Sequence, residues 1–366
     1  MALDCCSWQE PLKDALLQMR GSLPNAVLIY GPRGAGTVEV VISFVKSLFC
    51  EHPDVDGSPC GSCQGCRLAD AYTHPDIAYV MNEVESLLRH IPYTEPDSAK
   101  KDRKLFKEIL ISQTRSLTDF LNLSAHGASG RRAVVVYPAD TLRVDAASAL
   151  LKNLEEPPEN TVFFLVADDI DRVLPTIRSR CRLLRAPGAD FASAVRFLSR
   201  QGVPHPEEAL RSASGQPFSV LYERALEADD SLDKKTRDEL LTLGALTGAA
   251  RGDLLGALSA GGSMPLQRIF IKDAKGAIPV SAFVSVLLEW AYDLARCAKG
   301  LEPHYFPEYA DALKDVAAMA KPEALYDWAD SLKGIRALAS HPLSAQLVLE
   351  QALIRYRRIA SGKSFQ

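Results

Sequence analysis

Four cysteines near the N-terminus have the spacing of a metal site. Cys50 is followed, after a short loop, by Cys60, Cys63 and Cys66, which are separated by two-residue spacers. Four thiolates at these spacings suit a tetrahedral zinc ion whose shell is full, so the site would be structural and not catalytic. The sequence therefore predicts a structural zinc site, and the alternative is a set of free thiols or an oxidised pair.

Two histidines and three further cysteines lie outside this cluster. His52 and His74 are close to it in sequence, but four cysteines already complete the shell, so we interpret both as bystanders. Cys5, Cys6 and Cys297 have no partners at ligand spacing. They are expected to be ordinary thiols.

A glycine-rich segment follows an apolar run and precedes an apolar helix. The segment contains Gly31, Gly34 and Gly36, which is the setting of a phosphate-binding P-loop. The pattern needs a lysine and then a hydroxyl, whereas this chain has Thr37 and Val38. No register supplies the ammonium group. We interpret the loop as a degenerate P-loop kept for the fold, and weak residual nucleotide binding is the alternative.

The positions at which ATPases of this type hold magnesium also depart from the pattern. Those carboxylates follow the third strand of the sheet. Here the strand predicted at residues 133–137 ends in Tyr137 and Pro138, and Asp140 lies too far along to take their place. We expect Asp140 to be a loop or cap residue.

A third candidate group is the segment Ser179, Arg180 and Cys181. A guanidinium has a fixed charge and a planar fork of donors that suits phosphate. From the residues alone, Arg180 could reach a bound phosphate or could pair with the nearby carboxylates of Asp168, Asp169 or Asp171. Cys181 is not expected to be a nucleophile.

The elements that must position these residues alternate between strand and helix. Continuous apolar runs at residues 26–30, 76–80, 133–137 and 161–167 indicate buried strands of a parallel sheet. Helical periods cover residues 8–20, 38–49, 109–123 and 145–156, and the last of these stops before Pro157 and Pro158. A short helix is expected to open near Pro175.

Composition limits the classes of function. The chain has 366 residues, a net charge of -4 and 24% charged residues. This length allows two or three domains, and the charge argues against binding nucleic acid through bulk positive charge. The sequence has neither a span long enough to cross a membrane nor the pattern of a signal peptide, so a cytoplasmic location is expected.

Taken together, the motifs resemble those of the AAA+ clamp-loader subunits of bacterial DNA polymerase III. The resemblance rests on GPRGAG, CxxCxxC, LLKNLEEPPENTVFFLVADD and IRSRC, and it covers about residues 24–185. The worn P-loop, the missing acidic residues and the segment from Gly215 to Ser219, where the motor would carry an arginine, favour the delta-prime branch over the gamma/tau motor. The resemblance implies that Arg180 acts as an arginine finger on ATP held by a neighbouring subunit.

The resemblance also implies an architecture and a set of partners. It implies an α/β AAA+ domain with the zinc module over residues 1–187, a helical lid over 188–230 and an all-α collar that holds the ring over 231–366. The implied partners are gamma/tau and delta subunits, the sliding clamp and primed DNA, with no membrane and no ATP bound by this chain. In the collar, the apolar faces at 279–297 and 343–359 could be core or interface.

Two rival functions remain open at this stage. One is an active ATPase of the gamma/tau type. The other is a zinc-dependent module that binds nucleic acid on a degenerate ATPase scaffold, with the basic run at residues 100–104 as its contact. For that run, the alternative is a solvated loop, and solvation is also our interpretation of Arg355, Arg357 and Arg358 near the C-terminus.

Overall fold

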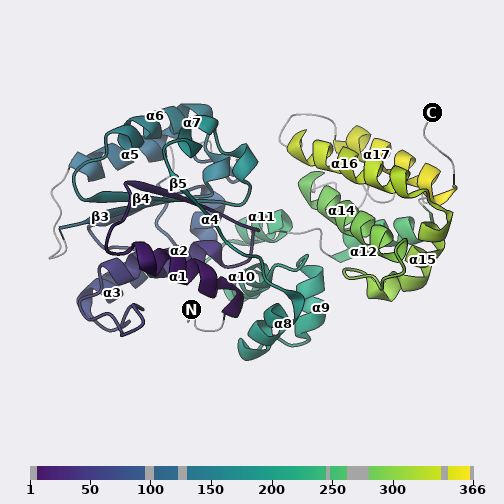
Figure 1. Ribbon diagram of the computed structural model, residues 1–366, viewed down its shortest axis with the longest axis horizontal. Helices are drawn as coiled ribbons and strands as arrows, with labels where there is room; N and C mark the ends of the chain where they lie inside the picture. Colours follow the sequence, from purple (N-terminus) through teal and green to yellow (C-terminus); the bar gives the residue numbers. More distant parts are fainter. Residues whose placement is uncertain are drawn as a thin grey trace. The chain divides into compact units, whose positions relative to one another are not determined.

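A computed structural model describes residues 6–94, 103–122, 130–244, 248–261, 280–338 and 345–362. The chain divides into two units (Figure 1). The first comprises residues 1–206 and 216–226, and the second comprises residues 207–215 and 227–366. Each unit is described by itself below.

The first unit is built on a parallel sheet of five strands in the order β2-β3-β4-β1-β5. The parallel α/β architecture predicted from the apolar runs is confirmed. Four strands lie within a residue of their predicted positions, whereas β5 was not predicted. The strands are β1 (Ala26–Tyr30), β2 (Ile77–Met81), β3 (Arg132–Tyr137), β4 (Thr161–Ala167) and β5 (Arg182–Arg185).

Each strand of the sheet's centre is buried on both sides because helices cover both faces (Figure 1). One face packs against α1 (Glu10–Met19), α2 (Thr37–Leu48) and α3 (Gln64–Asp70). The other packs against α5 (Ile111–Asn122), α6 (Val144–Glu155) and α7 (Pro175–Arg178). Alternate residues of β4 enter the two cores, as Phe163 and Phe164 illustrate. This explains why the strand sequence is apolar without a break.

Shorter elements connect the sheet to the loops at the carboxyl ends of its strands. A short helix, α4 (Glu83–Leu88), begins directly after β2 and was not predicted from the sequence. The remaining elements of the first unit are η2 (Ser7–Gln9), η3 (Ala139–Thr141), η4 (Ile170–Arg172), α8 (Phe191–Arg200) and most of α10 (Pro217–Ala228). All of α9 (Pro206–Ser212) except its first residue belongs to the second unit.

The second unit has its own apolar core, formed by helices. Trp290, Trp328 and Tyr356 are fully buried at its centre, and the Trp290 indole N–H donates to the Tyr356 hydroxyl at 3.0 Å. The helices are α11 (Lys234–Gly244), α12 (Gly248–Ser259), α14 (Val280–Cys297), α15 (Ala310–Met319), α16 (Pro322–Leu338) and α17 (Ala345–Ala360), with the short η5 (Pro307–Tyr309).

The apolar faces predicted for this region can now be placed in part. The face of α14 that carries Phe283, Leu287 and Trp290 lies in the core of this chain. On α17, Leu353 is buried whereas Ile354 is 50% exposed. The side chains of Leu347 and Leu349 lie outside the part of the chain that the structure describes.

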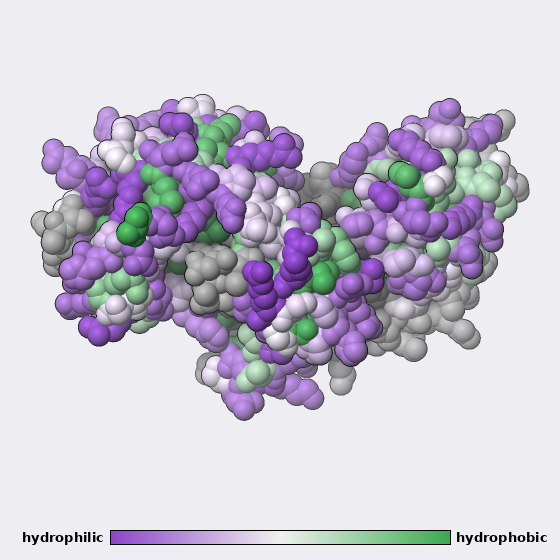
Figure 2. Space-filling view, turned by 60° about the horizontal axis from the view of Figure 1, so that its bottom comes forward, coloured by the Kyte–Doolittle hydropathy of each residue, from purple (hydrophilic) through white to green (hydrophobic). Residues whose placement is uncertain are grey.

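The surface offers scattered rather than continuous apolar groups in the view of Figure 2, where hydrophilic residues predominate. The exposed large apolar side chains of the described residues include Val55, Val144, Leu183 and Tyr292. Among the described residues, the helices are too short or too polar to cross a membrane.

Candidate functional site

The glycine segment forms the turn between β1 and α2, as the sequence predicts. Gly34 and Gly36 adopt φ angles of +68° and +87°, and Gly36 is the N-cap of α2. Positive φ angles favour glycine because it lacks a Cβ. The loop therefore lies at the carboxyl end of the sheet, where ligands bind in open parallel sheets.

The N-terminus of α10 packs directly on this loop. A Cβ on Gly36 would lie 2.4 Å from the Phe218 ring, and one on Gly34 would lie 2.6 Å from the Gln216 Cβ. The Phe218 N–H donates to the Gly34 carbonyl at 3.0 Å. The segment in which the motor would carry an arginine is thus closely packed against the loop by apolar and amide side chains.

The N-terminal end of the chain also holds the loop. The Trp8 indole N–H and the Gln9 side-chain amide both donate to the Ala35 carbonyl, at 2.8 and 2.7 Å. Trp8 also packs edge-on against Phe197, which stacks on Phe218. Trp8 therefore belongs to the structure that fixes the loop.

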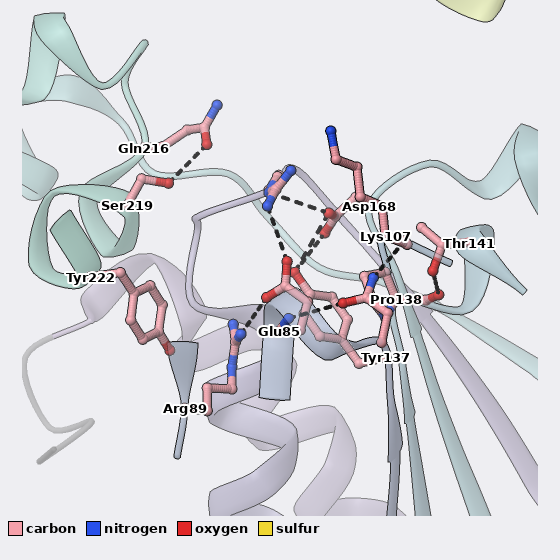
Figure 3. Close-up of polar contacts among 12 residues, drawn as sticks. Glu85, Arg89, Lys107, Tyr137, Pro138, Thr141, Asp168, Gln216, Ser219 and Tyr222 are labelled. Atoms are coloured by element: carbon pink, nitrogen blue, oxygen red, sulfur yellow. Dashed lines mark hydrogen bonds and ion pairs between the residues drawn. The ribbon is translucent and has the colours of Figure 1, made fainter. Parts of the chain in front are cut away.

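Beside the loop lies a buried cluster of charged and phenolic side chains, centred on Arg89 (Figure 3). The Arg89 guanidinium pairs with Glu39 at 2.9 Å and with Glu85, and it lies over the rings of Tyr137 and Tyr222. The Tyr222 hydroxyl donates to Glu39 at 2.5 Å. The charges are paired within the cluster, as burial requires.

Asp168 follows β4 at the edge of the same cluster. The Tyr137 hydroxyl donates to it at 3.2 Å, and Arg33 lies 3.9 Å away (Figure 3). Burial raises the pKa of Asp168 to about 7, although the charge of Arg33 opposes the rise. Asp140 lies within η3 instead of capping a helix, and it accepts a hydrogen bond from the Asp168 N–H at 3.0 Å.

The space left beside the glycine loop is small. Its volume is about 20 Å³, and its lining includes Gly34, Gly36, Thr37 and Phe218. Pockets that take small-molecule ligands usually measure about 300–1,000 Å³. A second hollow of about 850 Å³ shares Glu39, Arg89 and Tyr222 with the first, but its other walls come from α1, α2 and the loop at 54–61 instead of the P-loop. The glycines thus enclose room for about one water molecule.

The four predicted cysteine ligands come together. Their Sγ atoms all lie within 4.8 Å of one another, and those of Cys50 and Cys63 are 3.9 Å apart. A tetrahedral zinc ion with Zn–S bonds of about 2.3 Å needs sulfurs about 3.8 Å apart. Because the separations agree, the cluster can hold a metal ion of this kind.

Local structure prepares these sulfurs as ligands. Backbone N–H groups of Cys60, Cys63 and Cys66 donate to the sulfurs of Cys50, Cys60 and Cys63, at 3.3 to 3.4 Å. Hydrogen bonds from the backbone of Ser62 and Cys63 lower the pKa of Cys60 to about 6, which favours the thiolate that binds metal. Burial raises the pKa of Cys66, so a cation would have to draw off its proton.

His74, which lies near the cluster in sequence, has another role in the structure. His74 is buried, packs against Phe49 and accepts the Asp76 N–H on its Nδ1 at 3.1 Å. Gly65 has a steric reason to be glycine, since a Cβ there would lie 2.2 Å from the Phe49 carbonyl. The close approach of α3 to the end of α2 brings Cys66 toward Cys50.

Arg180 lies on the turn between α7 and β5 and is exposed. The sequence left open an ion pair between Arg180 and an adjoining aspartate, and these partners are wrong. Arg180 pairs instead with Glu155 at the end of α6. The adjoining Asp171 pairs with Arg178. Arg180 also donates to the Thr176 carbonyl at 2.9 Å. Cys181 is partly buried, and burial raises the pKa of its thiol to about 11, which does not favour a nucleophile.

The basic run is only partly visible in the structure. Arg103 pairs with Glu83 at 2.6 Å and lies over the Phe106 ring. Its charge is therefore engaged within the chain. Residues 100–101 lie outside the described residues.

Several residues of the cluster were not found from the sequence. Glu85 and Arg89 have an i, i+4 spacing that could have indicated a helical ion pair. Glu39 and Tyr222 gave no local signal, because their hydrogen bond joins residues 183 positions apart. Glu155 was part of a recognised motif, but no contact with Arg180 could be inferred.

These features define a P-loop-type α/β domain whose glycine loop lacks its lysine and is closed by the chain itself. Within that class, the family described as "DNA polymerase III, delta subunit" matches residues 10–189. Over these residues, just under half of the chain, the sequence is similar to that family.

Named relatives agree with this assignment. The chain is 35% identical to the DNA polymerase III subunit delta′ of Pseudomonas aeruginosa over 221 residues, which cover 59% of this chain and 60% of that protein. The Escherichia coli subunit delta′ is also 35% identical, over 54% of this chain and 53% of that one. The subunit tau of Bacillus subtilis is 31% identical over 47% of this chain and 26% of its own.

These matches confirm the resemblance to the delta-prime clamp-loader subunits. The chain spans between about half and three fifths of the length of these delta-prime relatives. What the whole protein does is therefore a matter for proposal.

Proposed function

We propose that this chain is a delta-prime-type subunit of the bacterial DNA polymerase III clamp loader. In this role it supports ATP-dependent loading of the sliding clamp in DNA replication without hydrolysing ATP itself. The observation that carries the proposal is the glycine loop, which has no lysine and is packed against Gln216 and Phe218. A triphosphate would have to displace α10 and would still meet no ammonium group.

The proposal includes a role for Arg180 outside its own chain. An exposed guanidinium on the turn before β5 can reach ATP on a neighbouring gamma/tau-type subunit, where it would stabilise charge developing on the phosphates. The partners in this proposal are gamma/tau and delta subunits in a hetero-oligomeric ring, with the clamp and primed DNA reached through the complex. The proposed compartment is the cytoplasm.

Zinc is proposed as the structural ion of the cysteine cluster. The supporting observation is the sulfur geometry around Cys50, Cys60, Cys63 and Cys66. The division into a domain at 1–187, a lid at 188–230 and a collar at 231–366 is likewise a proposal. Within it, the outer surfaces of the helices of the second unit would carry the contacts that hold the ring together.

Nucleotide binding by the isolated chain tests the first part of the proposal. We expect no ATP binding in a calorimetric titration into the millimolar range and no hydrolysis, while an active gamma/tau-type subunit measured in parallel binds and hydrolyses ATP. Micromolar binding or turnover by this chain alone would instead identify an active ATPase. Salt-dependent DNA binding by the isolated chain would support the rival nucleic-acid-binding module.

Replacement of Arg180 by alanine tests the second part. In a reconstituted clamp loader, hydrolysis at the site that Arg180 completes should fall by about 10³-fold or more, as for other fingers supplied in trans. The total rate of DNA-stimulated ATP hydrolysis should fall by the contribution of that one site. Gel filtration should show that the complex still assembles. Arg182→Ala is the matched control, since Arg182 is also exposed. Equal rates of ATP hydrolysis by the wild-type and Arg180→Ala complexes would refute the proposed role of Arg180.

A further inference from the structure

Arg180 is held in place by groups of its own chain. Its Nη2 pairs with the Oε1 of Glu155, and its Nη1 donates to the Thr176 carbonyl at 2.9 Å. Both side chains of the ion pair are partly open to water, with 36% of Arg180 and 49% of Glu155 exposed. The guanidinium of Arg180 is thus paired within its own chain and is still accessible to solvent.

Both groups that accept from Arg180 lie near the C-terminus of a helix. Glu155 is the last residue of α6, and Thr176 lies in α7, a single turn that ends at Arg178. Carbonyl groups at helix C-termini lack partners within the helix and carry partial negative charge. A carboxylate on the last turn of α6 adds to that charge, and Arg180 neutralises it. The guanidinium therefore has a stable position when no phosphate is present.

We propose that Glu155 is a positioning residue that holds Arg180 in a parked state and releases it when a neighbouring triphosphate is available. This inference rests on the proposed role of Arg180 as a finger. A guanidinium paired with a carboxylate is poorly placed for a phosphate, because the carboxylate repels the same anion that the arginine should attract. A triphosphate carries more charge than one carboxylate and suits the planar fork of arginine, so the exchange is favourable.

The size of the effect follows from the exposure of the pair. Ion pairs this open to water shift an equilibrium by about 1.5-fold to fivefold. The apparent affinity of Arg180 for the neighbouring triphosphate falls as the fraction of molecules with Arg180 paired to Glu155 rises. Glu155 would therefore tune how readily the finger engages, whereas loss of Arg180 itself would remove the finger.

Steady-state kinetics of the reconstituted complex test the inference. Glu155→Gln keeps the shape of the side chain and removes its charge, and we expect it to lower the KM for ATP by about 1.5-fold to fivefold with little change in kcat. Glu156→Gln is the matched control, because Glu156 is an exposed neighbour with the same charge. In an Arg180→Ala background, Glu155→Gln should have no effect. A raised KM in Glu155→Gln, or the same change in the Arg180→Ala background, would overturn the inference.

A measurement on the isolated chain tests the contact between Glu155 and Arg180 independently of the proposed role of Arg180 in ATP hydrolysis. NMR of the Arg180 guanidinium should show slower rotation and slower proton exchange in wild type than in Glu155→Gln, with Glu156→Gln like wild type. Identical behaviour in wild type and Glu155→Gln would refute the parked state and leave the finger standing. If Arg180→Ala leaves ATPase unchanged while the NMR difference is present, the finger fails and the contact is structural only.

Discussion

At the scale of single residues, the glycine loop lacks a lysine and is held by contacts within the chain. Arg89 occupies a buried position between Glu39 and Glu85, next to a loop that has no lysine of its own. Tyr137 stands where ATPases of this type carry a magnesium carboxylate, and its hydroxyl donates to Asp168. The residues of this cluster therefore hold the loop, α4 and α10 together.

Asp168 should make stability depend on pH. Its folded-state pKa of about 7 lies above the ordinary value of 3.8, so between these values the folded chain binds more protons than the unfolded chain. The contribution is therefore full below about pH 4 and is lost as pH rises through 7. Because each pKa unit corresponds to about 1.4 kcal/mol and the side chain is partly screened by water, we expect a decline of about 2 kcal/mol.

Urea unfolding of the first unit at several pH values measures this decline. Asp168→Asn should lack it, so the difference in unfolding free energy between wild type and variant should change by about 2 kcal/mol from pH 4 to pH 7. Asp171→Asn serves as the control, because the Asp171 side chain is 87% exposed. Parallel pH profiles for wild type and Asp168→Asn would show that Asp168 has an ordinary pKa.

At the scale of elements, the sequence predicted the features that depend only on neighbouring residues. β4 has the bounds predicted for it, because burial on both faces makes its whole sequence apolar. The cysteine cluster was found for a similar reason, since its members lie within 17 consecutive residues. β5 was missed because its four residues, RLLR, are largely exposed. The ion cluster was missed because its partners come from α2, α4 and α10, which only the tertiary fold brings together.

The cysteine cluster joins the end of α2 to the start of α3, and a variant can test what it contributes. Cys63→Ser removes one thiolate and also the sulfur that accepts the Cys66 N–H at the start of α3. Structural zinc contributes about 10 kcal/mol or more in small domains, so losing one of four ligands should cost at least about 3 kcal/mol. Elemental analysis should find about one zinc per wild-type chain and much less in the variant.

Cys297→Ser is the control for this experiment because Cys297 lies in the second unit. It should keep its zinc and leave the first unit as stable as in wild type. Wild-type protein purified without chelators and found free of zinc would refute the metal assignment directly.

At the scale of the whole molecule, cores that share no residues between the two units indicate two cooperative units. The cores around the sheet draw only on residues of the first unit, and the helical core around Trp290 and Trp328 draws only on the second. Domains with their own cores often unfold in separate steps. A defect in one core should therefore leave the other intact.

Paired substitutions measure this independence by native-state hydrogen exchange. Arg89→Met removes the cation that pairs with Glu39 and one of the two that pair with Glu85, since Arg33 still lies 3.0 Å from Glu85. This loss should destabilise the first unit by about 3 kcal/mol and speed exchange in β3 and β4. Trp328→Ala opens a cavity in the second core at a similar cost and should speed exchange in α14 and α16. Each variant should leave the other unit unchanged. The controls are Arg143→Ala and Tyr326→Ala, because both side chains are about half exposed. These substitutions should change exchange little. If either core variant speeds exchange equally in both units, the chain unfolds as one cooperative body and the separation of its cores has no energetic meaning.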